Sequence, residues 1–159
     1  MTQCKINSKN PIIQMVYNTK TTKQSCATSC FYDDSIPQNT EGDEILAVTI
    51  TPKRTSSILE IKFCGNLCPR TAKTNFVVAL FQDDIANALC CKMSNPGGGR
   101  SQTGTIIYYM TAGTTSATTF KIRGGSTDGN ALTVNGAWGD SQIFNGKCST
   151  TLSVTEYFS

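Results

Sequence analysis

The chain has 159 residues, of which 38% are hydrophobic and 16% charged, and its formal net charge is +3 from 14 basic and 11 acidic residues. This length fits one domain with a sizeable core. Nucleic-acid binding needs clustered positive charge, and the basic residues are dispersed, so nucleic acid is not an expected partner. The chain has no histidine, which excludes His-based catalytic triads, histidine acid–base catalysis and histidine-ligated zinc or haem.

Neither a membrane span nor a secretion signal is apparent in the sequence. No stretch approaches the ~20 apolar residues that a membrane-spanning helix needs. The first residues, Met1-Thr-Gln-Cys-Lys5, lack the apolar core of a signal peptide. We therefore expect no membrane span, and we expect synthesis in a cytoplasm.

The first half of the chain contains segments with the sequence pattern of β-strands. The first of them is Ile12–Tyr17. Hydrophobic and polar residues alternate in Ile45–Ile50 and more regularly in Ile58–Phe63, as in a strand with one buried face. Phe76–Phe81 is apolar on both faces, which indicates a strand covered on both sides.

The second half continues the same pattern. Ile106–Met110 is again apolar on both faces, which is typical of a central strand or of a strand at an oligomer interface. Alternation returns in Thr119–Arg123 and Thr151–Thr155, and Ala131–Val134 and Gln142–Phe144 predict two short strands between them. About nine or ten short strands, spaced by roughly 8–12 residues, favour a sandwich or a barrel.

Turn dipeptides separate the late strands. Asp128-Gly129, Asn135-Gly136 and Asn145-Gly146 are of the hairpin type, because both central positions of a type I′ turn require a positive φ. These dipeptides support an antiparallel arrangement in which neighbouring strands are joined by tight turns.

Several stretches, in this order, resemble a known family. They are Ile36-Pro-Gln-Asn-Thr-Glu-Gly-Asp-Glu-Ile-Leu-Ala-Val-Thr-Ile-Thr-Pro-Lys53, Val77-Val-Ala-Leu-Phe-Gln-Asp83 with Ala86-Asn-Ala-Leu89, and Met110-Thr-Ala-Gly-Thr-Thr-Ser-Ala-Thr-Thr-Phe-Lys-Ile-Arg-Gly-Gly125. The last two stretches, near the C-terminus, are Ser141–Gly146 and Thr151–Glu156. Over residues 12 to 157 the chain resembles phage and environmental-virus structural domains, which often stand at the C-terminal ends of tail fibres and related virion appendages. It departs from them in its many cysteines, Cys90-Cys91 included.

The resemblance implies a fold and a role. The fold is an all-β, jelly-roll-like antiparallel β-sandwich of about 8–10 strands, similar in shape to trimeric C1q/TNF-like heads. Residues 1–159 would form a single domain, with residues 1–11 as an N-terminal arm. The role is that of a virion protein made in the host cytoplasm: a capsid decoration or cap, a minor capsid protein or a fibre head. Its expected partners are itself, as a homotrimer, and other capsid or tail proteins, and no enzymatic activity is expected.

Two groups of residues are candidates for contact. Ile106, Tyr108 and Met110 are the candidate interface of a homotrimer, because trimerisation would hide a strand that is apolar on both faces. Arg100, Trp138 and Asp140 are the candidates for the alternative function, a receptor- or carbohydrate-binding module whose loops bind a host glycan or receptor.

Carboxylates occur in pairs at Asp33-Asp34 and Asp83-Asp84. Such pairs can serve a glycosidase or bind a hard cation, but the spacing of a calcium loop is not found. Loops and strand ends also collect aspartate because its side chain stabilises turns. We interpret these residues as solvated loop carboxylates and expect no cofactor.

The chain contains eight cysteines, and three interpretations of them remain open. Cys26/Cys30 and Cys64/Cys68 share a C-x3-C spacing, one residue longer than the usual zinc knuckle. Disulfides are the second interpretation, with these four residues as candidates, although residues i and i+4 of one strand lie about 13 Å apart, beyond the reach of a bridge. The third is that reduced cysteines act as small buried hydrophobes. A catalytic cysteine is not expected, since its thiolate needs a base or cationic neighbour.

Overall fold

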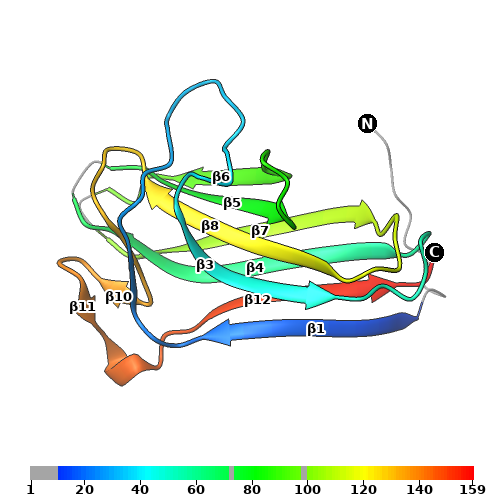
Figure 1. Cartoon of the computed structure of the whole chain (residues 1–159). Helices are drawn as coiled ribbons and strands as arrows, with labels where there is room; N and C mark the ends of the chain where they lie inside the picture. Colours follow the sequence, from blue (N-terminus) through cyan, green and yellow to red (C-terminus); the bar gives the residue numbers. More distant parts are fainter. Residues whose placement is uncertain (1–10, 72–73, 98–99) are drawn as a thin grey trace.

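The computed structural model describes residues 11–71, 74–97 and 100–159 and shows two packed antiparallel sheets (Figure 1). The predicted all-β sandwich is therefore confirmed. The predicted N-terminal arm, residues 1–11, lies almost wholly outside the described residues. The elements are β1 (Ile12–Lys20), β2 (Gln24–Cys26), β3 (Asp43–Ile50), β4 (Ile58–Pro69), β5 (Phe76–Gln82), β6 (Cys90–Ser94), β7 (Gln102–Thr111), β8 (Thr118–Ser126), β9 (Leu132–Val134), β10 (Gly136–Ala137), β11 (Ser141–Gln142), the 3-10 helix η1 (Phe144–Gly146) and β12 (Thr150–Tyr157).

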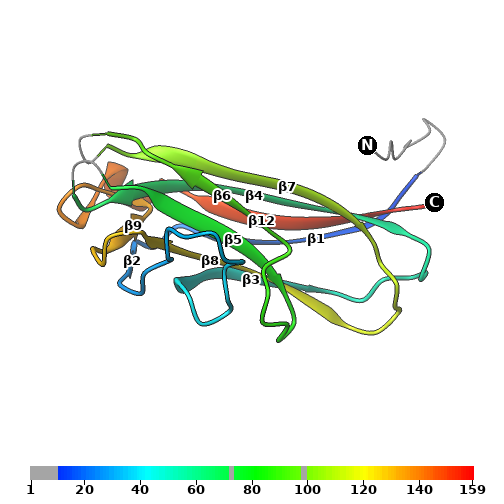
Figure 2. The same cartoon turned by 90° about the horizontal axis from the view of Figure 1, so that it is seen from above.

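The strand order is that of a jelly roll. One layer of the sandwich is the sheet β1-β12-β4-β7, and β9 and β2 extend it beside the end of β4. The opposing layer is the sheet β3-β8-β5-β6, and β10 and β11 form a separate two-stranded sheet. Among these eight long strands the first pairs with the last (β1–β12), the second with the seventh (β3–β8), the third with the sixth (β4–β7) and the fourth with the fifth (β5–β6). This nested pairing is one long hairpin coiled into two sheets, which is the double Greek key of the jelly roll. Figure 2 shows the two layers from above.

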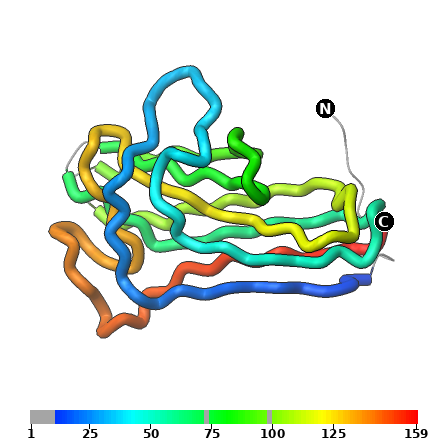
Figure 3. Tube along the Cα trace, viewed as in Figure 1, coloured from blue at the N-terminus to red at the C-terminus, as the bar shows by residue number. Residues whose placement is uncertain are grey.

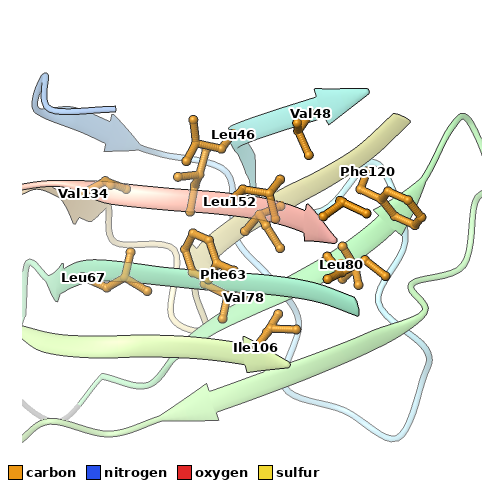
Figure 4. Close-up of a cluster of buried hydrophobic side chains, with 14 of the residues drawn as sticks. Leu46, Val48, Phe63, Leu67, Val78, Leu80, Ile106, Phe120, Val134 and Leu152 are labelled. Carbon is orange, nitrogen blue, oxygen red and sulfur yellow. The ribbon is translucent and has the colours of Figure 1, made fainter. Parts of the chain in front are cut away.

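The two sheets enclose one hydrophobic core, as a single domain requires (Figure 4). In β4 the alternation predicted from the sequence holds: Leu59, Ile61 and Phe63 are buried in the core, whereas Lys62 is exposed. In β8 Phe120 and Ile122 point inward in the same way. The period of two therefore decides which side chains meet between the layers.

The two strands predicted to be apolar on both faces behave differently. All residues of Phe76–Phe81 in β5 are buried, because segment 27–42 lies across the outer face of this sheet. The Cys30 N–H donates to the Ser126 carbonyl at 3.0 Å, and the Arg123 guanidinium donates to the carbonyls of Glu41 and Gly42. The expectation of a covered strand is thus confirmed for β5.

β7 is an edge strand and one of its faces is open. It pairs with β4 alone, and Ile107 and Tyr109 are 55% and 47% exposed. A central position for Ile106–Met110 was therefore a wrong prediction. A strand at the edge of a sheet contacts the core with only one face, and the other face is left to solvent or to a partner.

Other strands differ from the sequence prediction in smaller ways. β2 and β6 were not predicted, since the first has only three residues and the second, Cys-Cys-Lys-Met-Ser, lacks alternation. Gln142–Phe144 is not one strand but the end of β11 followed by η1. None of the three predicted turn dipeptides closes a hairpin. Asp128-Gly129 joins β8 to β9 of the other sheet, and Asn145-Gly146 lies in η1. Asn135-Gly136 joins β9 to β10, with Asn135 fully buried at a φ of 56°.

Hydrogen bonds from side-chain amides join the two sheets along one pair of neighbouring edges. Gln14 donates to the Thr51 carbonyl at 2.8 Å and Asn18 to the Ala47 carbonyl at 3.1 Å, while Gln24 donates to the Glu44 carbonyl at 2.8 Å. These bonds connect β1 and β2 of one sheet to β3 and to Thr51, which follows it, at the edge of the other sheet. Over the ranges that the structure describes, no helix is long and apolar enough to cross a membrane.

Candidate interaction surfaces

The outer face of the β1-β12-β4-β7 sheet carries exposed apolar side chains in register. One row runs Tyr17, Ser153, Lys62 and Ile107, and the next runs Met15, Thr155, Glu60 and Tyr109. Met15, Tyr17, Ile107 and Tyr109 are exposed, although all four are large and hydrophobic. We call the outward side chains of these two rows the open sheet face.

A carboxylate is buried at the centre of the open sheet face. Glu60 is 5% exposed and accepts hydrogen bonds from the hydroxyls of Tyr109 and Tyr157, the latter at 2.8 Å. The Lys62 ammonium lies 3.0 Å from the same carboxylate. Burial opposes the ionisation of Glu60, but the hydrogen bonds from Tyr109, Lys62 and Tyr157 outweigh it and lower the pKa of the carboxyl group.

This cluster fixes the tyrosines and determines which charge the face exposes. The bond to Glu60 raises the pKa of Tyr109 to about 12, so its hydroxyl stays protonated and keeps donating. Lys62 directs one of its ammonium donors to Glu60, and its side chain remains 51% exposed. The exposed member of this ion pair, and so the charge that a partner would meet first, is therefore the cation.

The predicted interface residues lie on the opposite side of the same strand. Ile106 is fully buried, and Tyr108 and Met110 are half-buried and pack against the core. Because side chains alternate along a strand, a shift of one residue exchanges the buried and exposed faces. A role of β7 in an interface stays a prediction, and the side chains available for it are Ile107 and Tyr109.

The structure brings the predicted ligand-loop residues to one end of the sandwich. The exposed Trp138 donates its indole N–H to the Arg70 carbonyl. Asp140 forms ion pairs with Lys23 and Arg70, both at 2.8 Å, so its carboxylate already has partners. Arg100 is exposed at the same end, where the hydroxyl of the next residue, Ser101, donates to the Gly136 carbonyl at 3.3 Å. Ligand binding by these residues stays a prediction.

The seven cysteines of the described ranges are all thiols, and Cys4 lies outside those ranges. Cys64 and Cys68 both belong to β4, so a bridge between them is excluded by the extension of the strand. Burial raises the pKa values of the Cys26 and Cys30 thiols to about 12. Within the described parts of the chain, no group of three or more cysteine, aspartate or glutamate side chains lies close enough together to hold a metal ion.

A surface loop projects from the side of the β3-β8-β5-β6 sheet (Figure 3). This loop was not identified as a candidate site from the sequence. We call residues 31–36 the aromatic loop. Its exposed apolar side chains are Phe31 and Tyr32, at 66% and 69%, with Ile36 beside them. The one signal in the sequence is an aromatic pair next to the acidic pair Asp33-Asp34, in a segment without strand periodicity.

Buried hydrogen bonds hold the base of the aromatic loop. Glu41 is 7% exposed, and its two carboxylate oxygens accept the backbone N–H groups of Phe31 and Gln38, both at 2.9 Å. Backbone bonds from Asn39 to the Ala86 carbonyl and from Ala88 to the Pro37 carbonyl tie the loop to segment 83–89. The loop therefore presents its aromatic side chains from a fixed base.

Acidic residues are concentrated around this loop. Residues 27–44 contain five acidic residues and no basic one, and Asp83 and Asp84 follow on the neighbouring loop. Lys121 pairs with Asp84 at 3.1 Å, but Asp33 and Asp34 at the tip are exposed. In a chain with a net charge of +3, this is a local negative surface.

No protein-family model matches the chain, and no curated protein matches it. Among solved structures it is similar to dimeric latent PorU from Porphyromonas gingivalis (10% identity, TM-score 0.41, 91% of this chain and 13% of that one). It is also similar to the VP2 subviral particle of infectious bursal disease virus (10% identity, TM-score 0.41, 99% and 45%) and to the Gx strain of that virus (11%, 0.32, 100% and 42%). The chain spans less than half of each of these proteins, and we draw no functional conclusion from similarities at this level.

Proposed function

We propose that the protein is a structural component of a virus particle, located in the virion after synthesis in the host cytoplasm. In this role it is a capsid decoration or cap, a minor capsid protein or a fibre head. It acts by assembling with copies of itself, as a homotrimer, and with other capsid or tail proteins, and it catalyses no reaction. The family resemblance of the sequence supports this proposal, and so does the jelly-roll order of the strands.

The open sheet face is the observation that carries the proposal. Met15 and Tyr17 on β1 and Ile107 and Tyr109 on β7 leave apolar side chains exposed along both edges of this sheet, and exposed apolar side chains gathered on one face of a soluble protein mark sites of association. The buried cluster around Glu60 holds Tyr109 in place, which reduces the entropy lost on contact. The mechanism is docking of complementary surfaces.

Light scattering coupled to size-exclusion chromatography tests the proposal. We expect the protein at micromolar concentration to have the mass of a trimer, and Ile107→Glu to shift it to a monomer. Ile107 is exposed, so the substitution should change the free energy of unfolding by no more than about 0.5 kcal/mol. Phe144→Glu is the matched control, because Phe144 is exposed on η1, outside the open sheet face. A monomeric wild-type protein would contradict the proposal.

The alternative function is a receptor- or carbohydrate-binding module. The observation that favours it is the gathering of Trp138, Arg100 and Asp140 at one end of the sandwich, with the Trp138 ring exposed. An aromatic face beside a cation suits an acidic sugar or a protein side chain. A glycan array with and without calcium, compared with Trp138→Ala, tests this function. An array without signal would refute the glycan-binding form of it.

A further inference from the structure

We propose that the open sheet face of one copy receives the aromatic loop of a second copy, so that the protein associates head to tail. This inference rests on the proposed assembly function and names the partner of the open sheet face. It is supported by the construction of the loop, by the charges of the two surfaces and by their positions on the sandwich.

The aromatic loop is built to present side chains. Glu41 accepts the N–H groups of Phe31 and Gln38, and the Cys30 N–H donates to the Ser126 carbonyl of β8. A loop fixed in this way loses little conformational entropy on binding. Phe31 and Tyr32 are nevertheless mostly exposed, and aromatic side chains of this kind are frequent anchors of protein interfaces.

The charges of the loop and the face are opposite. The tip exposes Asp33 and Asp34, and no basic residue occurs in segment 27–44. The open sheet face exposes the ammonium of Lys62, whereas its carboxylate, Glu60, is buried beneath the tyrosines. Apolar contact of Phe31 and Tyr32 with the face would therefore bring the aspartates toward a cation.

The same charges disfavour contact between two open sheet faces. In an isologous dimer the same patch meets itself. Lys62 belongs to β4, an inner strand of the sheet, and lies in one row with Tyr17 and Ile107. A two-fold axis near the centre of this face would bring the two lysines together, and the only carboxylate of these two rows, Glu60, is buried and already has its own partners. Opposed like charges are unfavourable, especially where water is excluded.

The positions of the two surfaces allow each molecule to use both. The base of the loop crosses the outer side of the β3-β8-β5-β6 sheet, where Arg123 holds it, and the open sheet face is the outer side of the other sheet (Figure 2). Each copy therefore has one donor and one receiver. A heterologous contact of this kind closes into a ring, such as a trimer, when the rotation between copies permits it.

Mixing two variants tests the head-to-tail contact. The loop variant carries Phe31→Ser and Tyr32→Ser and keeps its open sheet face; the face variant, Ile107→Glu, keeps its loop. We expect each variant alone to be monomeric by sedimentation velocity, with self-association at least about tenfold weaker than that of the wild type. An equimolar mixture should form a one-to-one dimer that grows no further, since one intact loop and one intact face remain.

Controls and contrary outcomes separate this inference from the proposed function. Phe144→Ser removes an aromatic residue elsewhere that is at least as exposed, and this variant should assemble as the wild type does. Thermal unfolding verifies that every variant is folded. If the wild type and the loop variant assemble equally, the head-to-tail contact is refuted and assembly itself stands. If both variants are monomeric and the mixture is too, the contact is also refuted. A monomeric wild type refutes both proposals.

Discussion

Tyr157 donates its hydroxyl to the buried carboxylate of Glu60 at 2.8 Å, across the sheet that forms the open face. The bond connects the last strand to an inner one, and Tyr109 on the edge strand donates to the same carboxylate. One acidic side chain thus joins three strands on the outer side of the sheet, where its charge would normally be solvated.

Glu60→Gln should destabilise the protein by about 1–3 kcal/mol. The amide keeps one acceptor oxygen, but it loses the charge that strengthens the bonds from Tyr109, Tyr157 and Lys62. Chemical denaturation measures the change in the free energy of unfolding. Tyr157→Phe, which removes one of these bonds, should have a smaller effect, and an unchanged midpoint for Glu60→Gln would contradict a stabilising role for the cluster.

Stability should fall in acid, and Glu156 should account for part of the loss. Burial opposes the ionisation of this fully buried residue, but bonds from Gln14 and from the Lys53 and Arg54 N–H groups lower the pKa of its carboxyl group below the ordinary value of 4.5. A group whose pKa is lower in the folded state contributes stability above its unfolded pKa and loses it as the pH falls toward the folded pKa.

Thermal unfolding at a series of pH values from neutral to strongly acidic measures this contribution. The wild type should lose more stability between neutral pH and acid than Glu156→Gln does. Parallel curves for the two proteins would show that Glu156 is not the group responsible.

Gly125→Ala should displace the base of the aromatic loop. A Cβ atom at Gly125 would lie 2.2 Å from the Thr28 carbonyl oxygen and 3.1 Å from the Cys30 nitrogen, so the backbone of segment 27–42 must move. We expect a loss of about 1–3 kcal/mol in the free energy of unfolding and faster proteolysis within residues 31–36. Ser116→Ala, in an exposed connection, is the control and should change neither measurement.

Thiol alkylation should divide the cysteines into two groups. Cys64 and Cys91 are exposed, whereas Cys26 and Cys30 are buried and burial raises their thiol pKa values to about 12. Only the thiolate reacts, so mass spectrometry after labelling near pH 8 should find Cys64 and Cys91 modified before Cys26 and Cys30. Labelling of Cys26 or Cys30 that requires prior reduction would reveal a disulfide and contradict the thiol state.

The sequence was sufficient to predict the architecture but not the faces that remain free. The alternation in Ile58–Phe63 and Thr119–Arg123 predicts the strands and their inner residues, because the side-chain period of a strand is two. Two-sided apolar runs do not reveal what covers each side. Phe76–Phe81 is covered by a loop, while the outer side of Ile106–Met110 is open, and this difference depends on tertiary placement alone.

The aromatic loop could not be predicted for a related reason. Its base is held by Glu41 accepting backbone N–H groups at 2.9 Å, and such bonds leave no periodic pattern in a sequence. An acidic residue in a polar segment is typical of a solvated loop. Only the fold shows that Glu41 is buried, that Asp33 and Asp34 are exposed, and that Phe31 and Tyr32 stand beside them.

The hydrogen bonds donated by the side-chain amides of Gln14, Asn18 and Gln24 also affect how molecules of this protein behave when they are crowded together. These bonds occupy carbonyl oxygens of β3 and of Thr51, which follows it, and unoccupied carbonyls on a strand edge can recruit a foreign strand into a fibril. With these acceptors engaged, crowded molecules should not extend one another's sheets along this edge. The molecule is thereby protected on this flank against amyloid-like growth, also at the high local concentrations that the proposed assembly would create.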